Sequence, residues 1–437
     1  MDQVRYGKLL NTHDIIRWVH YDDFSFDLIK EGQNESSIDP IDNYIEGLTL
    51  DGKNIYIYSR DSFSIHKGLT HLNTSGFLIG NKIDKGNISG LRFSGGILNS
   101  LFSPQRLDIN YKNNEYLVNS HDDSIKKSFT INGNEYILRI MSVIKEVYGL
   151  GTSLNNDEVI FEITANNGIK LGEIEKIYHA VDKMCQFLTF RKNVDFGKVE
   201  LLQSETYNEQ TFDNNICELH VKKEFEITTN KHRFQCISFE EIGENIDTLF
   251  KGFFEEKDNK PYFNLDFLPD NDKDYQFITS AKIRNICTCL ECEANIQKIP
   301  AKDDKNLKKL ITEVKTLIQK HKESDDRLDE KTYSLIFGSI NHWDLSASDK
   351  IKGLFRKYYE ILLQTKCFHY SIESFENAID SLIKYRNTTT HGNYMQVTGD
   401  HAETATNLMN MIYISRLDRI GLSKELIKKI ICRGTVY

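Results

Sequence analysis

The hydrophobic residues of this chain change their spacing near residue 235. Before that point, short runs of β-forming residues are separated by turn sequences such as Asp51-Gly52 and Asn132-Gly133. Alternation with a period of two is typical of strands, and these dipeptides favour tight hairpins. After that point, apolar residues recur every three or four positions, as in amphipathic helices. The sequence therefore predicts an α+β chain with a β-rich first part and an all-helical second part.

These two parts define the expected domains, residues 1–234 and residues 235–437. Many short strands with regular turns predict a sandwich or barrel-like fold for the first domain, an architecture used more often for recognition than for catalysis. One amphipathic helix is expected within it, near residues 172–190. The helical domain is expected to open at Ser238-Phe-Glu-Glu241, which has the pattern of a capping box.

The overall composition is typical of a soluble protein. No apolar run approaches the length of a membrane span, and the first residues do not resemble a signal peptide. The eight cysteines are scattered along the chain, so a framework of disulfides is not expected. We therefore expect a cytoplasmic protein that does not bind membranes.

The candidate chemistry lies in the segment Leu382-Ile-Lys-Tyr-Arg-Asn-Thr-Thr-Thr-His-Gly392. Four residues separate Arg386 from His391, and Asn387 follows the arginine directly. The preceding residues predict an amphipathic helix that ends near Arg386, because three β-branched threonines then weaken it. A guanidinium can hold a phosphate bidentately, and an imidazole can transfer a proton near neutral pH. This combination suits cleavage of a phosphodiester.

A second pair, Arg60 and His66, has a similar spacing but follows a strand-like run, and we interpret it as accidental. The run Arg386-Asn387-x-x-x-His391, by contrast, resembles the signature of HEPN-domain ribonucleases. The order of elements before it is similar to that of ApeA-like anti-phage proteins, which place a β-rich domain before the HEPN domain. The resemblance covers residues 235–437 and, more loosely, the first half of the chain.

The resemblance implies a HEPN helical bundle with metal-independent endoribonuclease activity and no cofactor. His391 would act as general base or acid, Arg386 would stabilise charge on the phosphate, and Asn387 would orient the histidine or a phosphate oxygen. It also implies an RNA substrate, a homodimer or higher oligomer, and a role in abortive infection, with a phage-derived trigger acting at the N-terminal domain. The alternative is a non-catalytic HEPN-like protein that binds a ligand or partner and dimerises through its bundle.

The net charge of −9 argues against broad binding of nucleic acid, but the charge is unevenly distributed. Eight lysines and arginines face four acidic residues from Ser381 to Tyr437, so this segment carries +4 and the rest of the chain carries −13. A local basic region fits an RNA site contacted by Lys384, Arg416 and Arg419. Exposed helices are often equally basic for solubility alone, and both interpretations stay open.

Three cysteines, Cys287, Cys289 and Cys292, lie close together on a predicted helix. At about 100° per residue, their offsets scatter the thiols over about 200° of arc. A structural zinc site needs four converging ligands, and no fourth is near in the sequence. We expect buried thiols and no metal, although the sequence does not decide this.

Overall fold

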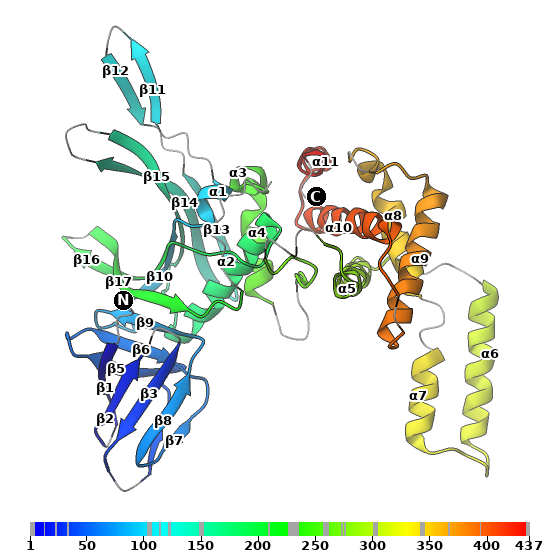
Figure 1. Cartoon of the computed structure of the whole chain (residues 1–437), viewed down its shortest axis with the longest axis horizontal. Coiled ribbons are helices and arrows are strands. Elements are labelled where there is room, and N and C mark those ends of the chain that lie inside the picture. Colours follow the sequence, from blue (N-terminus) through cyan, green and yellow to red (C-terminus); the bar gives the residue numbers. More distant parts are fainter. Residues whose placement is uncertain are drawn as a thin grey trace. The chain divides into compact units, whose positions relative to one another are not determined.

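The computed structural model divides into two compact units, Met1–Tyr262 and Phe263–Tyr437 (Figure 1). A β-sheet dominates the first unit and the second consists of helices, which confirms the predicted α+β class. The structure describes residues 5–12, 14–21, 24–32, 35–102, 107–112, 115–120, 124–147, 153–208, 210–225, 236–256, 262–271, 274, 277–299, 305–340, 346–365, 368–393 and 395–433, except for the side chains of 107–120, 144–147 and 153–157.

The first unit contains one antiparallel sheet of thirteen strands. The strand order is β13-β14-β15-β10-β16-β17-β9-β6-β5-β1-β2-β3-β8, and two shorter pairs, β11–β12 and β4–β7, lie outside it. Many short strands predict a sandwich or barrel, whereas the observed strands join edge to edge in one continuous sheet. The strand bounds are β1 Arg5–Leu9, β2 Ile16–His20, β3 Ser25–Lys30, β4 Ser36–Ile38, β5 Tyr44–Thr49, β6 Asn54–Tyr58, β7 Phe63–Ile65, β8 Gly68–Asn73, β9 Gly76–Gly80, β10 Ile88–Ser94, β11 Leu107–Lys112, β12 Glu115–Ser120, β13 Ile125–Ile131, β14 Asn134–Val147, β15 Ser153–Ala165, β16 Lys198–Tyr207 and β17 Gln210–Val221.

Both predicted hairpin turns are present in this sheet. Asp51-Gly52 lies between β5 and β6, and Asn132-Gly133 joins β13 to β14. Asn132 and Gly133 both have positive φ angles, 50° and 82°, as the type I′ turn requires. Glycine and asparagine adopt this backbone conformation more readily than other residues, which is why the dipeptide marks the turn.

Alternate residues of the strands form the core at one end of the sheet. On β2, Trp18 is fully buried while its neighbours are not, and its ring lies 5.7 Å from that of Phe26 on β3. Gly7 on β1 makes this packing possible. A Cβ atom at Gly7 would lie 1.9 Å from the Leu48 carbonyl oxygen and 2.7 Å from the Trp18 ring, so a larger residue would force the strands apart.

Helices cover the other part of the sheet. They are α1 Leu98–Leu101, the 3-10 turn η1 Leu171–Glu173, α2 Ile174–Thr189, α3 Phe239–Ile242, the 3-10 turn η2 Gly243–Asn245 and α4 Ile246–Phe254. The predicted helix near 172–190 is confirmed as α2. The capping box before α3 is also confirmed, since the Ser238 hydroxyl accepts from the Glu241 backbone N–H and the Glu241 carboxylate accepts from that of Ser238.

The end of the first unit differs from the predicted boundary at 234/235. The α4 helix packs against α2 and β13. Its aromatic residues join the core of the sheet, with the Phe250 ring 5.6 Å from Phe129 and the Phe254 ring 5.6 Å from Tyr136. The start of the helical sequence is therefore earlier than the start of the second unit at Phe263.

Four helices that contact one another form the centre of the second unit: α5 Ser280–Ile296, α8 Ala347–Leu362, α9 Ile372–Thr390 and α10 Gly399–Arg419. A further helix, α11 Lys424–Cys432, packs on α8 and α10. Two others, α6 Lys305–Lys322 and α7 Glu330–Ile340, pair with each other as a hairpin. The apolar spacing of the sequence predicts helices over about 274–297, 303–322, 346–363, 372–386 and 400–419 and a short one near the end of the chain, so it predicts each of these helices except α7. None of the helices among the described residues combines the length and apolar character needed to cross a membrane.

Candidate active site

Helix α9 carries the Arg-Asn-x-x-x-His motif. The helix begins after Ser371, whose hydroxyl accepts a hydrogen bond from the backbone N–H of Ser374. Its inner face is formed by Phe375, Ile379 and Leu382, which are fully buried in the bundle. This packing fixes the direction of the helix and thereby the position at which its last turn ends.

The last turn of α9 extends further than expected. The three threonines are predicted to weaken the helix near Arg386, but it continues to Thr390 and His391 forms its C-cap. The Thr388, Thr389 and Thr390 hydroxyls each donate to the carbonyl oxygen four residues earlier, over 2.9, 3.0 and 2.7 Å. These bonds hold the hydroxyls against the helix instead of letting them open it.

Arg386 and Asn387 are joined by a side-chain hydrogen bond. Nη1 of Arg386 donates to Oδ1 of Asn387 over 3.1 Å. The backbone N–H of His391 donates to the carbonyl oxygen of Asn387 over 3.3 Å, so Asn387 and His391 are one helical turn apart. The side chain of His391 is exposed and has no hydrogen-bond partner among the described residues. The structure thus brings the three motif residues to the same helix end, with the imidazole open to solvent.

Glu291 on α5 is a further member of the site that the sequence analysis does not identify. Its Oε1 lies 2.6 Å from Nη2 of Arg386, and both side chains are about one quarter exposed. This ion pair fixes the guanidinium in one orientation, because its Nη1 and Nη2 groups are then both engaged. No local pattern connects two residues this far apart in the chain, so only the packing of α5 on α9 reveals the contact.

Tyr385 connects the site to the rest of the bundle. Its side chain is 1% exposed, and its hydroxyl contacts the Ser280 hydroxyl at 2.5 Å and donates to the Met395 carbonyl oxygen at 3.2 Å. Its ring lies 4.7 Å from that of His401. The residue next to Arg386 is thereby tied to the start of α5, to the segment after the motif and to α10.

In comparisons with known proteins, no family model, no curated protein and no solved structure matches the chain.

The three basic residues predicted to contact RNA have different environments. Lys384 is exposed on α9. Arg416 is fully buried, with Nε 3.1 Å from Glu293 Oε1 and Nη2 2.5 Å from the Asn264 carbonyl oxygen. Arg419 is 14% exposed and also lies 3.1 Å from Glu293. Arg416 thus has no surface with which to touch RNA, whereas the RNA contacts expected of Lys384 and Arg419 stay predictions.

The cysteine group is largely buried. The thiols of Cys287 and Cys289 are inaccessible, and burial raises the pKa of each to about 12, so that both remain protonated at neutral pH. The Cys289 thiol donates to the Asn264 carbonyl oxygen at 3.4 Å. Within the described parts of the chain, no group of His, Cys, Asp and Glu side chains is arranged to hold a metal ion.

Lys282 is a buried amine near the start of α5, and it gives a prediction about pH. Burial lowers its pKa to about 8, and the opposing effect of Asp274 and Asp270 is smaller. Between about pH 8 and 10.5, the unfolded chain binds a proton that the native protein has released, so the free energy of unfolding should rise with pH across this window. We expect Lys282→Met to remove up to about 3 kcal/mol of this rise.

Denaturant unfolding at several pH values measures this effect, with the exposed Lys384→Met as the matched control. Below pH 8 the Lys282 variant should be more stable than the native protein, because the cost of burying a charged amine is gone. An unchanged pH dependence in the Lys282 variant would contradict the lowered pKa.

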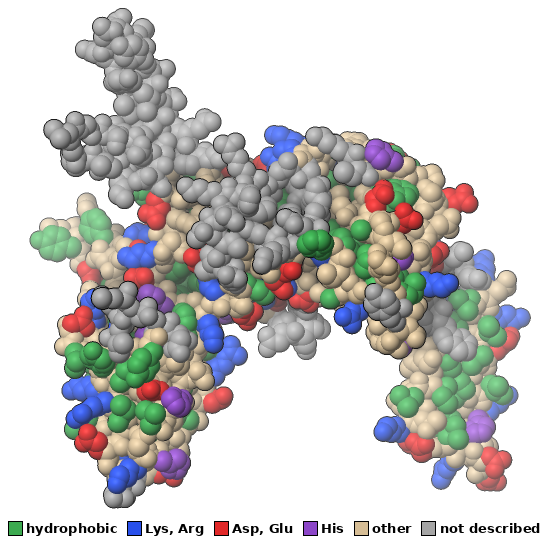
Figure 2. Space-filling model, viewed as in Figure 1, with side chains coloured by type: hydrophobic (Ala, Val, Ile, Leu, Met, Phe, Trp, Pro, Cys, Tyr) green, Lys and Arg blue, Asp and Glu red, His purple; other side chains and the backbone are tan. Residues whose placement is uncertain are grey.

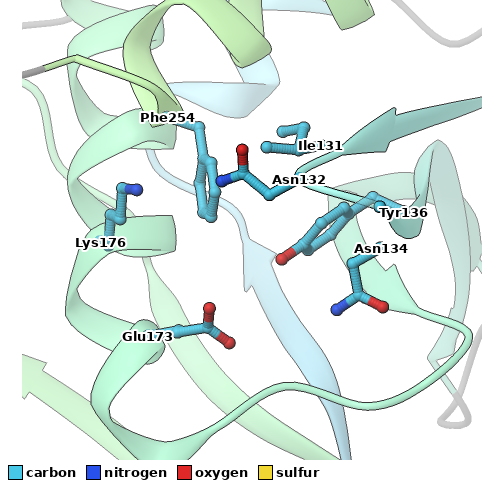
Figure 3. Close-up of a pocket in the computed structure, with 8 residues that line it drawn as sticks. Ile131, Asn132, Asn134, Tyr136, Glu173, Lys176 and Phe254 are labelled. Atoms are coloured by element: carbon cyan, nitrogen blue, oxygen red, sulfur yellow. The ribbon is translucent and has the colours of Figure 1, made fainter.

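The first unit contains a separate pocket of about 260 Å³ (Figure 3). The buried side chains of Ile131, Tyr136 and Phe254 line it, while polar side chains at the turn between β13 and β14 and at the start of α2 surround it. Nζ of Lys176 lies 4.3 Å from the centre of the Phe254 ring. Amide, carboxylate, ammonium and phenol groups around a small hollow can hold a small polar molecule. No residue of the α9 motif takes part in this pocket.

Proposed function

We propose that the chain is a metal-independent endoribonuclease of the HEPN type, and that its active site is the end of α9. The observation that carries this proposal is the hydrogen-bonded pair of Arg386 and Asn387, with an exposed His391 one turn further along the same helix. A fixed cation and an imidazole open to solvent, both carried by the last turns of α9, supply the groups needed for charge stabilisation and proton transfer.

The reaction follows from the roles of these groups. The 2′-hydroxyl of a ribose attacks the adjacent phosphorus, and the bond from phosphorus to the 5′-oxygen breaks. The proton of the 2′-hydroxyl goes to a base, and another proton reaches the departing 5′-oxygen. The products are a 2′,3′-cyclic phosphate and a free 5′-hydroxyl. His391 serves one of these proton transfers, and Arg386 stabilises the negative charge that develops on the phosphate oxygens.

Glu291 has a defined part in this proposal. A guanidinium carries five N–H donors, and the contacts to Glu291 and Asn387 use two of them. The remaining donors are available to a phosphate, while the ion pair keeps the planar group from rotating. Lys384, exposed one turn before Thr388, adds a positive charge for the RNA backbone.

A single histidine does not easily serve both proton transfers. We therefore place two subunits around a two-fold axis, so that two motifs act on one phosphate. In the cellular setting that the resemblance implies, the β-rich unit senses a phage-derived trigger or restrains the nuclease, and cleavage of RNA in the cytoplasm causes abortive infection.

One observation favours the non-catalytic alternative. The short ion pair with Glu291 neutralises much of the charge of Arg386, which weakens its attraction for a phosphate. In this case the pair only ties α9 to α5, and the helical unit is a binding and dimerisation module.

Incubation of the purified protein with total cellular RNA distinguishes the two functions. The nuclease should produce discrete fragments that end in cyclic phosphate, and an excess of EDTA over Mg²⁺ should leave the pattern unchanged, because the proposed mechanism uses no metal. RNA that stays intact at high protein concentration, with or without phage lysate as a source of trigger, supports the binding module instead. Cleavage that stops in EDTA contradicts the metal-independent mechanism.

A further inference from the structure

The pocket of the first unit lies where the β13–β14 turn, the start of α2 and the end of α4 meet. Its volume of about 260 Å³ is below the range of about 300–1,000 Å³ that is usual for drug-sized ligands. All of its lining residues belong to the first unit. The size therefore fits a molecule of few atoms better than a nucleotide or a peptide.

Tyr136 on β14 brings a buried polar group to this pocket. The residue is 2% exposed, and its ring lies 5.6 Å from that of Phe254. Figure 3 shows its hydroxyl directed at the open space of the pocket. The Asn134 amide acts on this hydroxyl as a donor, and no group among the described residues accepts a hydrogen bond from it. The pocket thus contains a hydrogen-bond donor that the described protein does not use.

The proton of this hydroxyl stays in place at neutral pH. Burial raises the pKa of Tyr136, and the negative charge of Glu173 raises it further. The hydroxyl is therefore a donor under cellular conditions, and it needs an acceptor from a bound molecule.

Glu173 and Lys176 bring opposite charges to the same pocket. They are three residues apart at the start of α2, so their side chains are neighbours. Within the part of the chain that the structure describes, neither has an ion-pair partner within 4.0 Å. Oε2 of Glu173 accepts from the Lys170 backbone N–H at 3.1 Å, and Nζ of Lys176 lies 4.3 Å from the centre of the Phe254 ring. A carboxylate and an ammonium group thus face the pocket without an ion pair between them.

The charges at the pocket balance. Glu173 contributes −1 and Lys176 contributes +1, while the Asn132 amide adds a neutral donor and acceptor. On the described part of the visible face of the first unit, basic and acidic side chains are mixed (Figure 2). Such a surface does not attract a strongly charged ligand. The groups at the pocket are complementary to a molecule that has one positive end, one negative end and no net charge.

We propose that this pocket binds a small zwitterion of the α-amino-acid type. The ammonium group of the ligand pairs with Oε1 of Glu173, and its carboxylate accepts from Lys176 and from the Tyr136 hydroxyl. Each charge of the ligand then meets an opposite charge, and the hydroxyl hydrogen of Tyr136 has an acceptor. The proposal does not rest on the nuclease function, because the pocket and the α9 motif share no residue.

Titration calorimetry of the full chain tests the requirement for both charges. L-Alanine is the main probe, with glycine and L-serine as close relatives. Propionate lacks the ammonium group of L-alanine, ethylamine lacks the carboxylate, and glycerol is of similar size without charge. We expect one site per chain for the zwitterions. Propionate, ethylamine and glycerol should each bind at least about tenfold more weakly, because each loses a hydrogen bond between charged groups.

Glu173→Gln is the sharpest variant, since glutamine can replace glutamate in a capping box and keeps the acceptor for the Lys170 N–H. Its affinity for L-alanine should fall about tenfold, and propionate should then bind no worse than L-alanine. Tyr136→Phe removes only the hydroxyl, and Lys176→Met removes the ammonium group. Both should also weaken L-alanine binding about tenfold. Lys170→Met is the matched control, because this lysine is exposed and does not line the pocket.

Circular dichroism verifies that each variant is folded. Failure of all three zwitterions to bind the native chain would overturn the proposal, and so would equal affinities for L-alanine and propionate. Binding of L-alanine that is unchanged in Glu173→Gln and Lys176→Met would equally exclude this pocket as the site.

Discussion

Replacement of His391 by alanine should reduce RNA cleavage by a factor of about 10²–10⁴, because a general acid or base contributes that much to rate. Arg386→Ala should have an effect of similar size, since it removes the charge that we propose stabilises the phosphate in the transition state. Both residues lie at the end of a helix, and His391 is exposed. We therefore expect each variant to lose only about 1 kcal/mol of stability and to remain folded.

The measurement is the rate of RNA cleavage at matched concentrations of folded protein, with growth inhibition on expression as a second readout. Arg60→Ala and His66→Ala are suitable controls, because they have a similar spacing in the chain. The structure gives Arg60 other contacts, to the Tyr58 hydroxyl at 2.5 Å and to Glu175 at 3.5 Å. Full activity in either motif variant means that the end of α9 is not the active site.

Glu291→Gln tests whether Glu291 assists cleavage by orienting Arg386 or hinders it by neutralising the charge of Arg386. This change leaves Arg386 in place but removes the anion that fixes it. If orientation matters more, cleavage falls; if neutralisation by Glu291 limits the attraction for phosphate, cleavage rises. Either change in rate connects Arg386 to the reaction, whereas a purely structural ion pair alters stability alone.

The sequence predicts the position of a helix well wherever the helix buries one face whose apolar residues are regularly spaced. The apolar spacing of Phe375, Ile379 and Leu382 is sufficient to place α9. The sequence misplaces the end of α9. The low helix propensity of threonine does not take into account the hydrogen bonds that the Thr388 and Thr389 hydroxyls donate to carbonyl oxygens of the preceding turn. The sequence also misses α7, in which Leu335 is exposed and which buries few residues.

Contacts between distant segments are the part that the sequence does not predict. Hairpins such as β13–β14 follow from a local Asn-Gly turn, but the pairing of β9 with β17 has no local signal. The same holds for the site. The motif residues are close in sequence and are found together, whereas Glu291 comes from another helix. A count of basic residues in the sequence likewise treats Arg416 as a surface charge. In the structure Arg416 is buried and pairs with Glu293, which lies on α5.

Glu293→Gln should be the most destabilising of the changes considered for the helical unit. The Glu293 side chain is 1% exposed, and it is 3.1 Å from Arg416 and 3.1 Å from Arg419. Its Oε2 also accepts a hydrogen bond from the Ser415 hydroxyl at 3.2 Å. Removal of this carboxylate charge leaves the fully buried guanidinium of Arg416 without an anion in a medium of low polarity. Breaking a buried ion pair in this way costs about 3–5 kcal/mol.

Glu291→Gln, two residues earlier on the same helix, is the matched control for stability. The same chemical change there breaks a pair whose members are about one quarter exposed, so we expect a loss of only about 1 kcal/mol. Denaturant unfolding of both variants, followed by helical circular dichroism, measures the difference. Equal losses in the two variants contradict the assignment of Glu293 as the anion that stabilises the buried Arg416 and the partly buried Arg419. A triple variant with leucine or methionine at Glu293, Arg416 and Arg419 should recover much of the loss, because no buried charge then lacks a partner.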